Sequence, residues 1–179
     1  LISGEGIILR QKRLEHVSQD YEWRTDKELS ALDATTPLRM SFPEYRSVYQ
    51  NELQYPTPWS KRFAIETHDG KLIGNCMYYD IDTANRRALI GYTWYADAAR
   101  RTPINSESKL LLLQHLFEAA GAIAVEFRTH FFNQASRTAI ERLGAKQDGV
   151  LRSHQILPDG SIRDTVVYSI VASEWPAVI

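Results

Sequence analysis

Asn133 and Ser136 are the residues whose types and spacing point most clearly to chemistry. They open the segment 133–144, which reads Asn-Gln-Ala-Ser-Arg-Thr-Ala-Ile-Glu-Arg-Leu-Gly and ends on Gly144, a residue typical of a helix end. The alternation of apolar and polar residues at 125–129 predicts a strand just before this helix. Since α/β folds usually bind ligands where strands end, the polar helix start indicates a ligand site. The alternative interpretation is an ordinary capped helix.

The elements that would position this helix follow from hydrophobic periodicity and turn residues. Strands are predicted at 6–11, 62–67, 72–80, 88–95, 122–129, 146–156 and 162–170. Helices are predicted at 14–23, around 28–32, from Ser41 to about 54, from 102 or 105 to about 120, and at 133–144. Tight turns at 68–71 and 157–160 would close two hairpins. No repeat or linker divides this order, which predicts one mixed α/β domain over residues 1–179.

Composition excludes several classes of protein. With 179 residues, 44% of them hydrophobic, the chain can bury one sizeable core. A formal net charge of −1 argues against a general nucleic-acid or anionic-membrane binder. Cys76 is the single cysteine, so no intrachain disulfide can form, and no metal site is predicted. No apolar run has the length of a membrane helix, and the first ten residues lack a signal-peptide pattern, so we expect a cytoplasmic protein.

Three segments, in this order along the chain, resemble the GCN5-related N-acetyltransferase (GNAT) superfamily, and within it the ribosomal-protein N-acetyltransferase-like (RimJ/RimL-type) branch. They are the segment Ala-Arg-Arg-Thr-Pro-Ile-Asn-Ser-Glu-Ser-Lys-Leu-Leu-Leu-Leu at 99–113, the helix at 133–144, and the closing Pro-Asp-Gly-Ser-Ile-Arg-Asp-Thr-Val-Val-Tyr-Ser-Ile at 158–170. The resemblance implies a GNAT-like single domain. Its twisted sheet would have about seven mostly antiparallel strands with one splayed parallel pair, flanked by about four helices.

The resemblance also implies acetyl-CoA as the cofactor. It would lie where the strands at 89–95 and 122–129 splay apart, with Tyr92, Thr93 and Trp94 along its pantetheine arm and Asn133 bonded to it. The pyrophosphate would bind at the following loop and helix start, where free N–H groups and the helix dipole favour an anion. The residues expected there are Arg100, Arg101, Thr102, Ile104, Asn105 and Ser106.

This loop departs from the usual family signature, Gln or Arg followed by two residues, Gly, one residue, and Gly or Ala. Arg100 keeps the first position, but Pro103 and Asn105 occupy the two small-residue positions. Because proline has no N–H, one phosphate contact must be lost or supplied by a neighbour. We therefore expect weakened or re-routed binding.

The resemblance implies Ser136 as the proton donor to the departing thiolate, because Ile140 stands where many relatives have a tyrosine. The other interpretation of Ser136 is a second capping hydroxyl. Gln155 occupies the position of the Rim-type glutamate, and the neighbouring His154 is the candidate general base, although adjacent strand residues face opposite sides of a sheet. Water or a carboxylate such as Glu66 or Asp80 is the alternative route for the proton.

The predicted function is transfer of an acetyl group to a primary amine, either a protein N-terminal α-amino group or a small-molecule amine, by direct attack in a ternary complex. The alternative is a catalytically impaired CoA-binding protein of the same fold that acts as a binding or interaction module. No nucleic-acid or membrane partner is expected, and a homodimer is a possible assembly. The acceptor site would lie between the N-terminal helices and the last hairpin. Its candidate lining residues are Asp33, Arg39, Tyr45, Tyr55, Trp59 and Tyr78.

Overall fold

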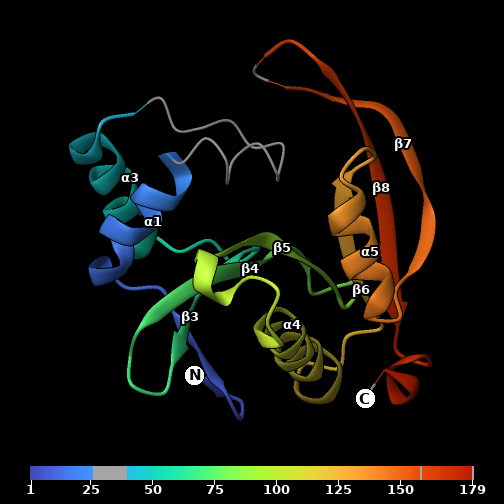
Figure 1. Cartoon of the computed structure of the whole chain (residues 1–179). Coiled ribbons are helices and arrows are strands. Elements are labelled where there is room, and N and C mark those ends of the chain that lie inside the picture. The colour runs from blue at the N-terminus through green and yellow to red at the C-terminus, as the bar shows by residue number, and fades with distance from the viewer. Residues whose placement is uncertain (26–39, 158, 179) are drawn as a thin grey trace.

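An open sheet of eight strands, in the order β1-β2-β3-β4-β5-β6-β8-β7, forms the frame of the computed structural model (Figure 1). The structure describes residues 1–25, 40–157 and 159–178. The strands are β1 (Ile2–Ser3), β2 (Ile7–Gln11), β3 (Lys61–Thr67), β4 (Leu72–Asp82), β5 (Arg87–Tyr95), β6 (Ala124–His130), β7 (Lys146–Ile156) and β8 (Ile162–Val171). Neighbouring strands are antiparallel except β5 and β6, which are parallel. The predicted fold is confirmed, and the short β1 adds a strand that the sequence pattern did not indicate.

Four α-helices lie in the described part of the chain. They are α1 (Val17–Thr25), α3 (Phe42–Gln54), α4 (Ile104–Gln114) and α5 (Gln134–Arg142). The helix predicted around 28–32 lies outside the described residues. The α-helix that was predicted to reach about residue 120 ends at Gln114. It changes at His115 into a π-helical turn (His115–Ala119), in which the Ala120 N–H donates to the His115 carbonyl five residues back.

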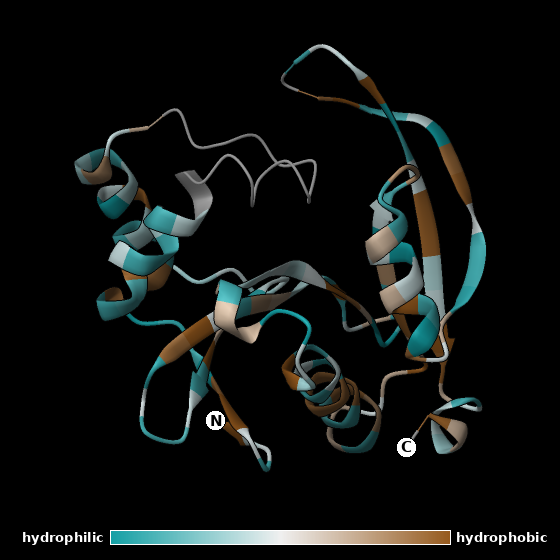
Figure 2. Ribbon diagram, viewed as in Figure 1, coloured by the Kyte–Doolittle hydropathy of each residue, from teal (hydrophilic) through white to brown (hydrophobic). Residues whose placement is uncertain are grey.

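The helices pack on both faces of the sheet. On β4, the Tyr78 hydroxyl donates to the Leu112 carbonyl of α4, whereas the Asn75 side chain donates to Asp20 of α1. Because side chains of a strand alternate between its faces, positions 75 and 78 place α1 and α4 on opposite sides. The larger core lies on the α4 side, and Figure 2 shows hydrophobic residues on α4 and through the middle of β8.

The β7–β8 hairpin reaches well beyond the rest of the sheet, and α5 lies against β6 and β8 (Figure 1). Arg137 of α5 donates from Nε to the Tyr168 hydroxyl, which donates in turn to Glu141. These bonds hold α5 on β8. In the described residues, no helix is long and apolar enough to cross a membrane.

Candidate active site

The site begins where the parallel strands β5 and β6 separate. They pair only at residues 87–89 and 124–126, after which both strands continue without pairing to each other. A cavity of about 510 Å³ opens at this point, lined by the two strands, α4, α5 and the β7–β8 hairpin. Backbone groups on the open side of β5 therefore face the cavity instead of a neighbouring strand.

A β-bulge at Tyr92 bends β5 at the split. Met77 lies opposite Gly91 and Asn75 opposite Trp94, so β5 carries one residue more than β4 between these pairs. Tyr92 takes up the extra residue with a φ of 50°, a left-handed conformation that costs on the order of 1–3 kcal/mol in a non-glycine residue. The Tyr79 ring packs edge-on against Tyr92, and a Cβ on Gly91 would lie only 2.9 Å from it. Gly91 therefore gives room to the ring, and Tyr92 makes the bend.

Helix α4 contributes a cation that the sequence analysis did not single out. Lys109 is only 8% exposed, lines the cavity and donates from Nζ to Thr93 Oγ1 on β5. Two side chains of α4 also hydrogen-bond Tyr95. Its hydroxyl donates to Asn105 Oδ1 at 2.9 Å and shares a hydrogen bond with the Ser108 hydroxyl. Burial raises the pKa of Tyr95, which keeps the phenol neutral. A lysine within the apolar face of this helix was the signal that could have identified Lys109.

The predicted pyrophosphate loop lies at the N-terminus of α4, which begins after Pro103 without a side-chain cap. Thr102 Oγ1 donates to the Ala99 carbonyl, and Arg100 lies 3.5 Å from the exposed carboxylate of Asp97. Of the predicted loop residues, all of which the structure describes, Asn105 alone lines the cavity. Those outside the lining are Arg100, Arg101, Thr102, Ile104 and Ser106.

Asn133 and Ser136 line the opposite wall. Asn133 is the N-cap of α5, because its Oδ1 accepts the Ser136 backbone N–H at 3.0 Å. Among the described residues, no hydrogen bond involves the Ser136 hydroxyl. The capping interpretation therefore applies to Asn133 and not to Ser136. At the far end, Gly144 has a φ of 87°, as expected for the residue that ends the helix.

Replacing this cap gives a first prediction. We expect Asn133→Ala to lower the free energy of unfolding by about 1 kcal/mol, because the Ser136 N–H loses its acceptor. Urea denaturation would measure the loss. The matched control is Gln134→Ala at the exposed neighbouring position, where we expect a change within about 0.5 kcal/mol. Equal stabilities of the two variants would contradict the capping role.

His154 and Gln155 both line the cavity, although they are adjacent on β7. Leu151 pairs with Thr165 and Gln155 with Arg163, so β7 has an irregularity between these pairs, and Ser153 there has a φ of 49°. This irregularity removes the strict alternation that would have turned His154 away. His154 Nδ1 shares a 2.8 Å hydrogen bond with the buried Thr165 Oγ1.

A second cavity of about 310 Å³ lies on the α1 side of β4 and β5. It shares Tyr79, Asp80, Tyr92 and Trp94 with the first, so the two cavities adjoin at the bulge. Of the residues proposed for the acceptor site, Asp33 and Arg39 lie outside the described residues. Tyr78 is buried in the core under α4 and Tyr45 in a cluster with Val17 and Tyr49 of the neighbouring helices, while Tyr55 and Trp59 are exposed. None of these four described residues lines either cavity.

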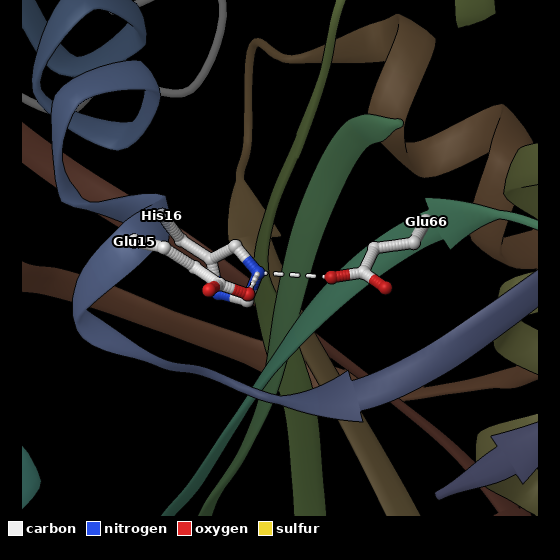
Figure 3. A group of neighbouring side chains, drawn as sticks. All are labelled: Glu15, His16 and Glu66. Atoms are coloured by element: carbon white, nitrogen blue, oxygen red, sulfur yellow. Dashed lines mark hydrogen bonds and ion pairs between the residues drawn. The ribbon is translucent and has the colours of Figure 1, made fainter. Parts of the chain in front are cut away.

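Glu66 also lies outside both cavities, in a group with Glu15 and His16 that has the composition of a metal site (Figure 3). His16 Nδ1 accepts the Arg13 backbone N–H, so the proton of the neutral ring is on Nε2, which donates to Glu66 at 2.9 Å. The other Glu66 oxygen accepts from Arg10 Nε at 3.0 Å. With its second nitrogen protonated, His16 has no lone pair for a metal ion, and the group is explained as a hydrogen-bonded structural cluster.

Comparison with known proteins agrees with this geometry. Residues 7–146 match the family described as the acetyltransferase (GNAT) domain. YdaF of Bacillus subtilis (strain 168), which has the provisional name of a ribosomal N-acetyltransferase, is 31% identical over 124 residues, or 65% of this chain and 67% of YdaF.

Two solved structures have the same fold. A GCN5-related N-acetyltransferase from Brucella melitensis is 25% identical with a TM-score of 0.86, over 99% of this chain and 80% of that one. Mycobacterium smegmatis RimJ, solved with CoA-disulfide, is 24% identical with a TM-score of 0.76, over 95% of this chain and 84% of that one. The name of YdaF agrees with the predicted Rim-type branch. The sequence match over most of the chain and the split parallel pair lead to one conclusion: this chain belongs to the GNAT family of N-acetyltransferases.

Proposed function

We propose that the protein transfers an acetyl group from acetyl-CoA to a primary amine by direct attack in a ternary complex. The observation that carries this proposal is the separation of β5 from β6, which leaves backbone donors and acceptors of β5 beside a cavity of about 510 Å³. Such groups are suited to bind the amides of a pantetheine arm. The CoA-disulfide in the RimJ structure supports CoA as the ligand of this fold. When bound, acetyl-CoA supplies the acetyl group in activated form, as a thioester.

The residues proposed to bind the pantetheine arm form two walls of the cavity. Tyr92, Thr93 and Trp94 on β5 face Asn133 and Ser136 on α5 across the cavity. The loop from Arg100 to Ser106 would hold the phosphates outside this cavity, where the N-terminus of α4 presents backbone N–H groups and Arg100 and Arg101 supply positive charge. Pro103 contributes no N–H there, so binding depends on its neighbours.

Ser136 is the proposed proton donor to the departing thiolate, because its hydroxyl lines the cavity and takes no part in the cap. His154 is the proposed base. If its Nδ1–H donates to Thr165 Oγ1, its Nε2 is left to accept a proton from the attacking amine. Asp80, which lines both cavities, is the alternative base among the carboxylates named above, since Glu66 is engaged with His16 and Arg10.

Thermal unfolding with and without CoA, followed by a thiol-release assay, tests the proposal. A ligand at 100 times its dissociation constant stabilises by about 2.7 kcal/mol, which corresponds to a Tm increase of roughly 5–10 °C at this chain length. When acetyl-CoA is then mixed with each of a panel of primary amines, the amount of CoA thiol released should be proportional to the amount of amine. Stabilisation without release from any amine would favour the catalytically impaired alternative, and no stabilisation would exclude CoA binding at this site.

The single cysteine gives a second prediction that bears on this assay. Cys76 is 1% exposed, and burial raises the pKa of its thiol to about 11, although Lys109 and Lys12 oppose the shift. At pH 7–8 the thiol is therefore protonated and shielded, and unreactive toward a disulfide reagent. We expect Ellman's reagent to titrate no thiol in the folded protein and one per chain in guanidinium chloride. A rapid reaction of the folded protein would contradict this burial.

A further inference from the structure

A second β-bulge lies on β4, the strand that pairs with β5. From 79 to 82 β4 advances by three residues, while its partner β5 advances by two, from 89 to 87. Asp80 lies within this bulge and has a φ of 45°, a left-handed conformation like that of Tyr92. Bulges change the direction in which a side chain points, and strained backbone of this kind concentrates at binding and catalytic sites. The Asp80 side chain is therefore a candidate for a functional role.

Asp80 lies where the two cavities adjoin. It lines both of them, together with Tyr79, Tyr92 and Trp94. The Tyr79 and Tyr92 ring centroids are 5.0 Å apart. Burial raises the pKa of Tyr79, and the nearby Asp80 carboxylate acts in the same direction, so the phenol is neutral. One carboxylate and three aromatic side chains therefore meet at the junction of the cavities.

The other charged groups that line the second cavity are paired. Lys12 lies 2.7 Å from Asp20, and Arg62 lies 3.4 Å from Glu52. Among the described residues, by contrast, no hydrogen bond or ion pair involves the exposed Asp80 carboxylate. Each cation that lines the first cavity in the described part of the chain is bonded to another side chain: Lys109 to Thr93, Arg128 to Glu126, and Arg163 to Thr165.

A carboxylate beside aromatic rings has the chemistry that recognises an alkylammonium ion. The carboxylate accepts charge-assisted hydrogen bonds, and the faces of tyrosine and tryptophan rings attract a cation. A primary alkylamine has a pKa near that of lysine, about 10.4, so it is an ammonium ion at neutral pH. At Asp80 this ion would lie between the cavity proposed for the pantetheine arm and the second cavity.

We propose that Asp80 binds the ammonium group of the acceptor amine and that the second cavity, of about 310 Å³, receives the rest of the acceptor. The inference rests on the proposed acetyl transfer and specifies how its acceptor is bound: as a cation, through the nitrogen that becomes acetylated. The nitrogen must lose a proton before it attacks the thioester, and that step is assigned to His154 above. Asp80 is thus a binding residue, and its loss should affect KM for the amine more than kcat.

Asp80→Asn tests the ammonium contact, with methylamine and 2-phenylethylamine as probes. Asparagine tolerates a positive φ as aspartate does, so the bulge is kept. We expect KM for both amines to rise at least about tenfold, the equivalent of one hydrogen bond to a charged group, with kcat and KM for acetyl-CoA unchanged. Asp148→Asn, exposed on β7 and outside both cavity linings, should change none of these values. A fall in kcat with unchanged KM for the amines would make Asp80 a base, and no effect would exclude any role; either result overturns the inference.

Arg62→Trp tests the second cavity, because Arg62 lines this cavity and not the first. The larger side chain should raise KM for 2-phenylethylamine about tenfold, a typical effect of a poor steric fit in a pocket. KM for methylamine, which has no large substituent to place there, should stay unchanged. Tm values of the variants verify folding. Equal effects on the two amines, or none, would overturn the assignment of this cavity and leave acetyl transfer intact. If the wild-type protein releases thiol with no amine, acetyl transfer itself fails and this inference fails with it.

Discussion

Asp20→Ala is expected to lower the free energy of unfolding by about 3–5 kcal/mol, a large share of the stability of a domain of this size. Asp20 is the centre of a buried polar cluster. One carboxylate oxygen accepts from Lys12 Nζ at 2.7 Å and from the Asn75 side chain at 2.8 Å, and the other accepts from the Tyr45 hydroxyl at 2.5 Å. The Lys12 and Asp20 side chains are 6% and 3% exposed, so Ala would leave a buried ammonium without this carboxylate.

Equilibrium unfolding in urea measures the effect, and two further variants scale it. Tyr45→Phe removes one hydrogen bond to the carboxylate and should cost about 1.5–3 kcal/mol. Asp97→Ala makes the same substitution at an exposed ion pair with Arg100 and should change stability by less than about 1 kcal/mol. If Asp20→Ala costs no more than Asp97→Ala, the cluster does not hold α1 on the sheet as described.

This cluster also marks a limit of sequence reasoning. Asp20 lies in a segment whose helical pattern gives no indication of burial, Lys12 lies just before that segment, and Asn75 is 55 residues from Asp20. Periodicity reports which face of an element is apolar, whereas the pairing of buried charges depends on which elements pack together. The order and approximate bounds of the elements could be predicted, because strand alternation, turn residues and the Gly144 helix end are local signals.

The candidate site shows the same division. The position of Asn133 at the start of α5 follows from its type and from the helix that comes after it, and the structure places it there. The bulge at Tyr92 could not be predicted, because the neighbouring Gly91 is the residue expected to take a positive φ. The irregularity at Ser153, which lets His154 and Gln155 share one cavity, depends on the register between β7 and β8. Register is set by tertiary packing, and strict alternation was the only guide available from the sequence.

Ser136→Ala is expected to lower kcat by roughly 10²-fold or more, the contribution typical of a general acid in the transition state. The substitution leaves the backbone N–H that bonds Asn133, so the cap and the start of α5 are retained. Because the hydroxyl acts on the leaving group and contributes little to binding, KM for acetyl-CoA should change little. Single-turnover measurements with rapid mixing would separate this chemical step from product release.

A hydroxyl elsewhere on the same helix provides the control. Thr138 lies two residues further along α5 and outside the cavity lining, so Thr138→Ala should leave kcat unchanged. A loss of kcat shared by both variants would indicate disturbance of the helix, and the Tm values would show it. If Ser136→Ala retains full kcat, water or a donor outside α5 must protonate the thiolate. Ile140 stands where the family resemblance implies a tyrosine in many relatives. Ser136 is therefore the one side chain of α5 lining this cavity that carries a hydroxyl.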